Sequence, residues 1–110
     1  MWVLLNDAMF SIVDKAADPS DLVVRARREG DIQKHFPSAK VKKTIGSDYL
    51  FRAEIARDVV SEVIAQNIMN IDYDNFKDSV DDHELHHAYS GIWSILARLQ
   101  PIAPYARRGR

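Results

Sequence analysis

The spacing of apolar residues changes once along the chain, and this change most strongly limits what the chain can fold into. In the first half, apolar side chains fall on every second position, as at Leu22, Val24 and Ala26, which is the period of a strand that buries one face. From Val59 onward they recur every three or four positions instead, as in a helix with one apolar face. Strands followed by helices predict an α+β fold.

Turn residues divide the alternating half into short strands. Asn6-Asp7, the segment 18–21 and Gly46-Ser47-Asp48 carry the residue types that form turns. Residues 30–36, before Pro37, have room only for a helix of one or two turns. The predicted strands are residues 2–5, 9–14, 22–28, 39–45 and 49–55. We therefore expect an antiparallel sheet of four or five strands.

Two longer helices are predicted in the second half. One begins after Ala56 and continues to about Ile71, and the other follows the apolar stripe that runs from Leu85 to Leu99 and ends before Pro101. A short helical turn is expected between them, near Phe76. The predicted architecture is an antiparallel sheet covered on one face by two C-terminal helices, and a chain of 110 residues is expected to form one domain, residues 1–110.

Composition excludes several classes of protein. The chain has no cysteine, so disulfides, cysteine-ligated metals and thiol nucleophiles are excluded. The apolar opening ends at Asn6, before the roughly 7 to 15 residues of a signal-peptide core, and no stretch approaches the roughly 20 apolar residues that span a bilayer. No phosphate-binding loop, dinucleotide motif or nucleophile elbow is present. We expect a cytoplasmic protein that is not a membrane protein, needs no cofactor and is not an enzyme.

Charge is distributed unevenly although the formal net charge is only −1. Residues 25–43 carry seven basic side chains against two acidic ones, whereas residues 58–84 carry eight acidic side chains against one lysine. Such a bipolar chain suits an oriented protein partner at least as well as a polyanion. Charge runs also commonly mark solvated faces, so this pattern does not by itself define a site.

A basic surface is the main candidate for binding. Alternation with the apolar residues places several cationic side chains on the outer face of the predicted sheet, and more arginines lie in the C-terminal tail. The candidate binding residues are Arg25, Arg27, Lys40, Lys42, Arg52, Arg107 and Arg108. Such a surface could bind nucleic acid by neutralising phosphates. RNA-binding sheets add exposed aromatic residues for base stacking, whereas Phe10, Tyr49 and Phe51 here fall in the apolar phase and are expected in the core.

The segment His83-Glu84-Leu85-His86-His87 matches the H-E-x-x-H pattern of zinc peptidases, in which two histidines bind the metal and the glutamate activates water. The helical period places His83 and His87 opposite the apolar stripe, so the pair is expected to face solvent. A third ligand could come only from upstream residues. Weak metal binding at His83 and His87 is therefore favoured over a catalytic zinc site, and a solvated, acid-rich helix start with no metal site is favoured over both.

Three segments resemble a family of small uncharacterised (hypothetical) bacterial and phage-encoded proteins. They are Met1-Trp2-Val3 with Phe10-Ser11-Ile12-Val13; Leu22 to Arg27 with Gly30-Asp31-Ile32; and Ile71 to Lys77, with Ala88-Tyr89 and Trp93 downstream. The resemblance implies a compact stand-alone protein. Its association with phage implies an anti-defence (anti-CRISPR-like) inhibitor of a host complex, and it implies no catalytic or binding residues.

Three functional hypotheses follow from the sequence. The first is a non-enzymatic binding protein that acts through a protein partner, and the second is a nucleic-acid-binding protein that uses the basic sheet face and the arginine tail. The third is a metal-dependent hydrolase at the HELHH segment. A homodimer through the open sheet face or an edge strand also remains open. Trp2, Tyr73, Phe76 and Trp93 are candidate anchors of an interface, or residues that close the edge of a small core.

Overall fold

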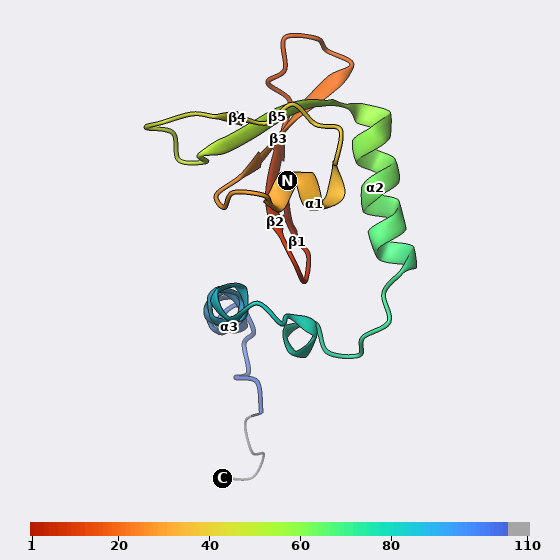
Figure 1. The fold of residues 1–110 in the computed structure, drawn as a ribbon. Coiled ribbons are helices and arrows are strands. Elements are labelled where there is room, and N and C mark those ends of the chain that lie inside the picture. The colour runs from red at the N-terminus through yellow and green to blue at the C-terminus, as the bar shows by residue number, and fades with distance from the viewer. Residues whose placement is uncertain (106–110) are drawn as a thin grey trace.

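The computed structural model describes residues 1–105 of the 110-residue chain, and its strands precede its longer helices (Figure 1). Its elements are β1 (Trp2–Leu4), β2 (Met9–Val13), β3 (Asp21–Ala26), α1 (Asp31–His35), β4 (Lys42–Lys43), β5 (Phe51–Ala56), α2 (Arg57–Met69), the 3₁₀ turn η1 (Lys77–Ser79) and α3 (His83–Ala97). The predicted fold class, an antiparallel sheet with C-terminal helices, is confirmed.

The five strands form one antiparallel sheet in the order β1-β2-β3-β5-β4. The hairpin predicted for residues 39–45 and 49–55 is present, but its first strand is reduced to Lys42 and Lys43, which pair with Arg52 and Phe51. The apolar residue that ends the predicted strand, Ile45, is 79% exposed. Because nothing in the described chain covers this end of the hairpin, burial does not extend the ladder there.

The main core lies on one face of the sheet. Alternate residues of β2, β3 and β5 point into it, and Phe10 and Val24 are fully buried. The helices α1 and α2 pack over β3 and β5 on this face, where Ile32 and Val60 join the same cluster. This face therefore follows the predicted alternation, and one of the two predicted C-terminal helices, α2, covers it together with the short helix α1.

The second C-terminal helix, α3, does not join α2 on this face as the sequence predicts, but packs on the other side of the β1–β2 hairpin. Val3 and Phe10 are cross-strand partners that point into the main core, and Leu4 and Met9, the next pair, point to the other side of the β1–β2 hairpin. There they pack with Leu85, Tyr89 and other residues of α3 and η1 in a second cluster. The Tyr89 hydroxyl donates to the carbonyl oxygens of Leu5 and Ala8 at 2.9 and 3.2 Å.

An ionic network holds the start of α3 to α1. Asp31, which is only 3% exposed, accepts hydrogen bonds from Arg28 at 3.3 Å and from Lys34 at 3.2 Å. Arg28 also donates to Asp82 at 2.9 Å, and the other Asp82 oxygen caps α3 by accepting the Leu85 N–H. Burial alone would lower the pKa of Arg28, but the hydrogen bonds to Asp31 and Asp82 outweigh it and raise the pKa.

This cap predicts an acid-dependent loss of stability. The Leu85 N–H first and Arg28 second hold the pKa of Asp82 below its ordinary value of 3.8. A lowered carboxyl pKa in the folded state means that the charge stabilises the fold above pH 3.8, and that this contribution is lost as the pH falls through the lowered value. Asp82→Asn keeps a capping oxygen but removes the charge. It should be less stable than the wild type at pH 7 and should approach it at pH values well below 3.8.

Thermal unfolding of the wild type and of Asp82→Asn, at pH 7 and at a pH well below 3.8, measures this difference in stability. Asp81→Asn, at an exposed neighbouring position, is the matched control and should leave the difference between the two pH values unchanged. An Asp82→Asn variant that keeps the full acid sensitivity of the wild type would contradict the assignment.

Candidate functional site: a basic face on the sheet

Three cationic side chains stand side by side on neighbouring strands, on the face of the sheet opposite the main core. The register pairs Arg25 of β3 with Arg52 of β5, and Arg52 with Lys42 of β4. Like charges directly opposite each other on adjacent strands are unfavourable. The fold therefore keeps a cationic row whose charges repel one another, and an anionic ligand would relieve that repulsion. We call this row, with Arg27 and Lys40 beside it, the basic face.

An aromatic ring underlies two of the arginines. The guanidinium carbons of Arg25 and Arg27 each lie 4.5 Å from the centre of the Tyr49 ring, within the range of a cation–π interaction. Arg25 also donates to the Ser11 hydroxyl at 2.6 Å, whereas its buried Nε has no partner among the described residues. Tyr49 is only 3% exposed, so its ring is buried against the two arginines.

The turn before β5 holds the guanidinium groups of Arg52 and Arg27 by hydrogen bonds. Arg52 donates to the Tyr49 carbonyl and the Asp48 carboxylate, each at 3.4 Å, and to the Ser47 hydroxyl. Arg27 donates through Nε to the Asp48 carbonyl at 3.3 Å. Because the chain's own turn holds these groups, less side-chain entropy is lost when they bind a ligand.

A shallow hollow of about 440 Å³ adjoins the row. Its lining includes Val23 and the backbone of Ala53, whose side chain lies in the main core, and its rim is mostly charged. The cationic rim residues are Lys15, Lys40, Lys42 and Arg52, and the acidic ones are Asp21 and Glu54. A predominantly cationic rim fits a carboxylate of a partner, which several of these side chains could bind in charge-assisted hydrogen bonds.

An exposed tryptophan ends the same row. Trp2 of β1 pairs with Ser11, and Ser11 pairs with Arg25, so the register places one position from each of the five strands in a single line. Trp2 is 69% exposed. Tryptophan and arginine are the residues most enriched at the energetic centres of protein interfaces.

The structure brings together most of the candidate residues taken from the sequence. Arg25, Arg52 and Lys42 form the row, and Arg27 joins it through Tyr49 although it lies beyond the end of β3. Lys40 lies outside β4 and lines the hollow from an exposed loop. Arg107 and Arg108 lie outside the described residues.

Tyr49 is the site residue that sequence reasoning missed. It shares the parity of Phe51 and Ala53 and was therefore expected in the main core. It is buried, but β5 begins only at Phe51, so Tyr49 lies in the turn, where strand parity does not apply. A tyrosine directly after Gly46-Ser47-Asp48, with arginines two positions apart on the neighbouring strand, is the signal that could have placed it.

The other candidate anchors lie around the second cluster, and Phe76 and Trp93 line a hollow together with Leu4. Tyr73, Phe76 and Tyr89 lie in successive ring contacts, with centroids 5.7 and 5.4 Å apart, and Phe76 and Tyr89 belong to the second cluster. Trp93 lies under the Lys77 ammonium, whose nitrogen is 4.7 Å from the ring centre.

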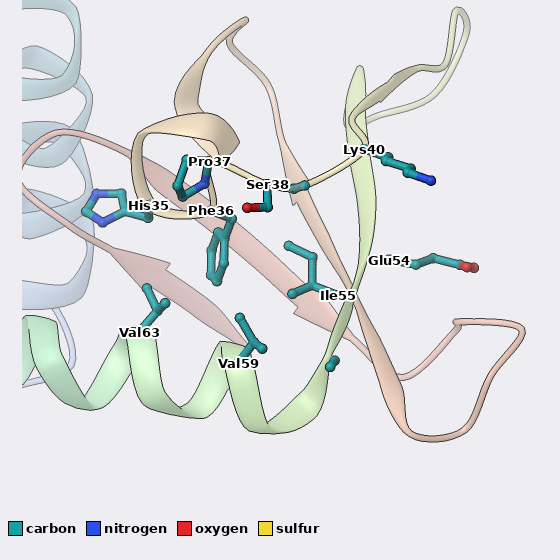
Figure 2. A pocket seen from close by; sticks show the side chains of 11 residues that line it. His35, Phe36, Pro37, Ser38, Lys40, Glu54, Ile55, Val59 and Val63 are labelled. Carbon is teal, nitrogen blue, oxygen red and sulfur yellow. The ribbon is translucent and has the colours of Figure 1, made fainter.

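A second hollow of about 430 Å³ lies between the loop after α1 and the start of α2 (Figure 2). Phe36, Ile55, Val59 and Val63 give it a mostly apolar lining, while Lys40 and Glu54 point away from this apolar centre. At its edge, His35 is hydrogen-bonded to Asp7 through Nε2 at 2.7 Å. The hollow thus offers apolar packing rather than a converging set of reactive groups.

His83 and His87 of the HELHH segment both lie exposed in the first turns of α3. Of the upstream residues that could supply a third ligand, Asp82 caps the helix and His35 pairs with Asp7. Within residues 1–105, no three or more histidine or carboxylate side chains gather in a way that could hold a metal ion.

The chain matches no family model, no curated protein and no solved structure. None of the helices found in residues 1–105 combines the length and the apolar character that crossing a bilayer requires.

Proposed function

We propose that the protein is a non-enzymatic binding protein whose basic face docks onto an acidic surface of a protein partner. The observation that carries the proposal is the row Arg25, Arg52 and Lys42, which three adjacent strands hold together despite its internal repulsion. Carboxylates on a partner would offset that repulsion and accept the free guanidinium N–H groups in charge-assisted hydrogen bonds. Trp2, at the end of the row, would add apolar contact area.

The resemblance to phage-encoded proteins supports a more specific form of this proposal. A small protein that binds through a fixed charged surface can block a larger assembly by covering one of its acidic surfaces. We therefore propose a bacterial defence complex as the class of partner and the cytoplasm as the place of action.

Nucleic-acid binding is the second candidate, and the same cationic row with the exposed Trp2 favours it. The burial of Tyr49 weighs against it, because a ring that is 3% exposed cannot stack on a base. Asp21 and Glu54 also place carboxylates in the hollow where phosphates would approach. A protein partner, which can match both signs of charge, fits this surface better.

Direct binding assays separate the two candidates. Labelled single-stranded DNA, single-stranded RNA and duplex DNA of roughly 20 nucleotides are mixed with the full chain at about 50 mM salt, where phosphate contacts are strongest. We expect no saturable binding of these probes. In parallel, the immobilised chain should retain a bacterial protein from nuclease-treated lysate, and an Arg52→Glu chain should not. Tight, salt-dependent binding of any oligonucleotide, with no protein retained, would replace the first candidate by the second.

A further inference from the structure

The second half of α3 extends beyond the part of the protein on which its first half is packed. Along one stripe of this helix, Leu85 and Tyr89 are 7% and 3% exposed, whereas Leu96 is 55% exposed, and Leu99, just beyond the helix end, is 79% exposed. Leu4 and Met9 pack in one cluster with Leu85, Tyr89 and Ile92 of α3, and α3 lies near the tip of the β1–β2 hairpin (Figure 1). A contiguous exposed apolar surface of this kind marks an interaction site.

The two sides of α3 that flank this apolar stripe differ in what packs on them. On one flank, Lys77 lies over the Trp93 ring and Tyr105 stacks on the same residue, with the ring centres 6.3 Å apart. On the other flank, Ala88, Gly91 and Ile95 are exposed, and Ile95 is 61% exposed. Nothing in the described chain packs on this second flank, which Leu99 adjoins.

Charge is confined to the two ends of this flank. From Leu85 to Ala97 the helix carries no Asp, Glu, Lys or Arg. Glu84 lies at one end and Arg98 at the other, both exposed, and each is seven residues from Gly91. A spacing of seven residues returns to the same side of a helix, so these three positions share the flank.

We propose that this flank of α3 binds the same flank of a second copy of the chain, with the two helices antiparallel. An antiparallel two-fold pair centred on Gly91 places Glu84 of each copy beside Arg98 of the other. A parallel pair would instead place Glu84 beside Glu84 and Arg98 beside Arg98. Charge complementarity between Glu84 and Arg98 therefore favours a second copy of the chain as the partner, with its α3 antiparallel.

The centre of the flank suits such a close approach. Gly91 has no Cβ, and a Cβ built there would meet nothing within 4 Å, so the space above the helix is open. The same two-fold places Ile95 of each copy opposite residues 87 and 88 of the other, where it would cover Ala88. A single pair of helices buries less than the roughly 800 Å² per partner of a standard interface, so we expect a weak dimer.

Sedimentation velocity of the full chain, at concentrations from about 10 µM to about 1 mM, measures this association. The mass should rise with concentration from 12.6 kDa toward twice that value. Ile95→Asp, at an exposed position, should stay monomeric over the whole range. A wild-type chain that remains monomeric at the highest concentration would overturn the proposal, as would a dimer that Ile95→Asp leaves intact.

A charge exchange tests the antiparallel direction. In an Arg98→Glu dimer, a glutamate at position 98 of each copy faces Glu84 of the other, so two repulsive pairs replace two attractive ones. The dissociation constant of the dimer should rise about tenfold. Adding Glu84→Arg to it should restore the wild-type value within about threefold, because the pairs are re-formed with their signs exchanged. Thermal unfolding confirms that each variant is folded, and Lys43→Glu on β4 is the control that should not affect association. Failure of the double exchange to restore binding would overturn the antiparallel arrangement.

Discussion

Replacing Arg28 with methionine is expected to lower the free energy of unfolding by about 3 kcal/mol, because it leaves a buried carboxylate short of its partners. Asp31 is 3% exposed and would keep only its bond to Lys34. The same substitution removes the link from Arg28 to Asp82, which caps α3. Urea unfolding followed by circular dichroism measures the change, and a loss under about 1 kcal/mol would show that Asp31 is not dependent on Arg28.

Two further variants show whether burial is the cause. Arg57 pairs with Asp14 at 2.6 Å, but both side chains are largely exposed, at 46% and 74%. Arg57→Met should therefore cost less than about 1 kcal/mol. Adding Asp31→Leu to Arg28→Met removes the stranded charge and should recover a substantial part of the lost stability. If both single arginine variants lose the same stability, the account of the network is wrong.

Reversing the charge at Arg52, the centre of the cationic row, is expected to lower the affinity for the protein partner at least about 100-fold. Arg52→Glu places a carboxylate against the partner's acidic surface, and like charges at an interface cost several kcal/mol. It also places a carboxylate between Arg25 and Lys42, where opposite charges on adjacent strands attract. That gain offsets the lost bonds to Ser47, Tyr49 and Asp48 in part.

The expected change in the stability of Arg52→Glu is therefore within about 1 kcal/mol of zero, whereas its binding is lost. Chemical unfolding and the affinity for the captured partner are measured on the same preparation. A variant that binds as tightly as the wild type would remove Arg52 from the interface. A variant that is severely unstable would show that the row is structural, and that its repulsion is relieved within the fold.

Most of the fold could be predicted because hydrophobic period depends on local spacing. The alternation around Val24 and the three-to-four spacing after Val59 correspond to β3 and α2. The side of the hairpin on which α3 packs could not be predicted in the same way. It depends on Leu4 and Met9, whose apolar side chains lie on the side of the hairpin that faces away from the main core. It also depends on the hydrogen bond between Arg28 and Asp82, which are far apart in the chain.

The candidate site was predictable in its charges and less so in its geometry. Strand parity placed Arg25, Lys42 and Arg52 on one face, but cross-strand register decides that they stand in one row, and register depends on turns that composition does not specify. Tyr49 was missed because it belongs to the turn before β5. Trp2 was recognised as a candidate anchor, but its place in line with the arginines needed the β1–β2 register.

The proposed binding by the basic face is tested most directly by two lysines next to each other on β4. Lys42 and Lys43 are both exposed, but Lys42 pairs with Arg52 on the basic face, whereas Lys43 pairs with Phe51 and points to the opposite side. The measurement is the affinity of the protein captured from nuclease-treated lysate for the Lys42→Glu and Lys43→Glu chains. We predict that Lys42→Glu weakens binding about tenfold or more and that Lys43→Glu changes it less than about twofold. Equal effects of the two substitutions, or no effect of either, would contradict a docking site on this face of the sheet.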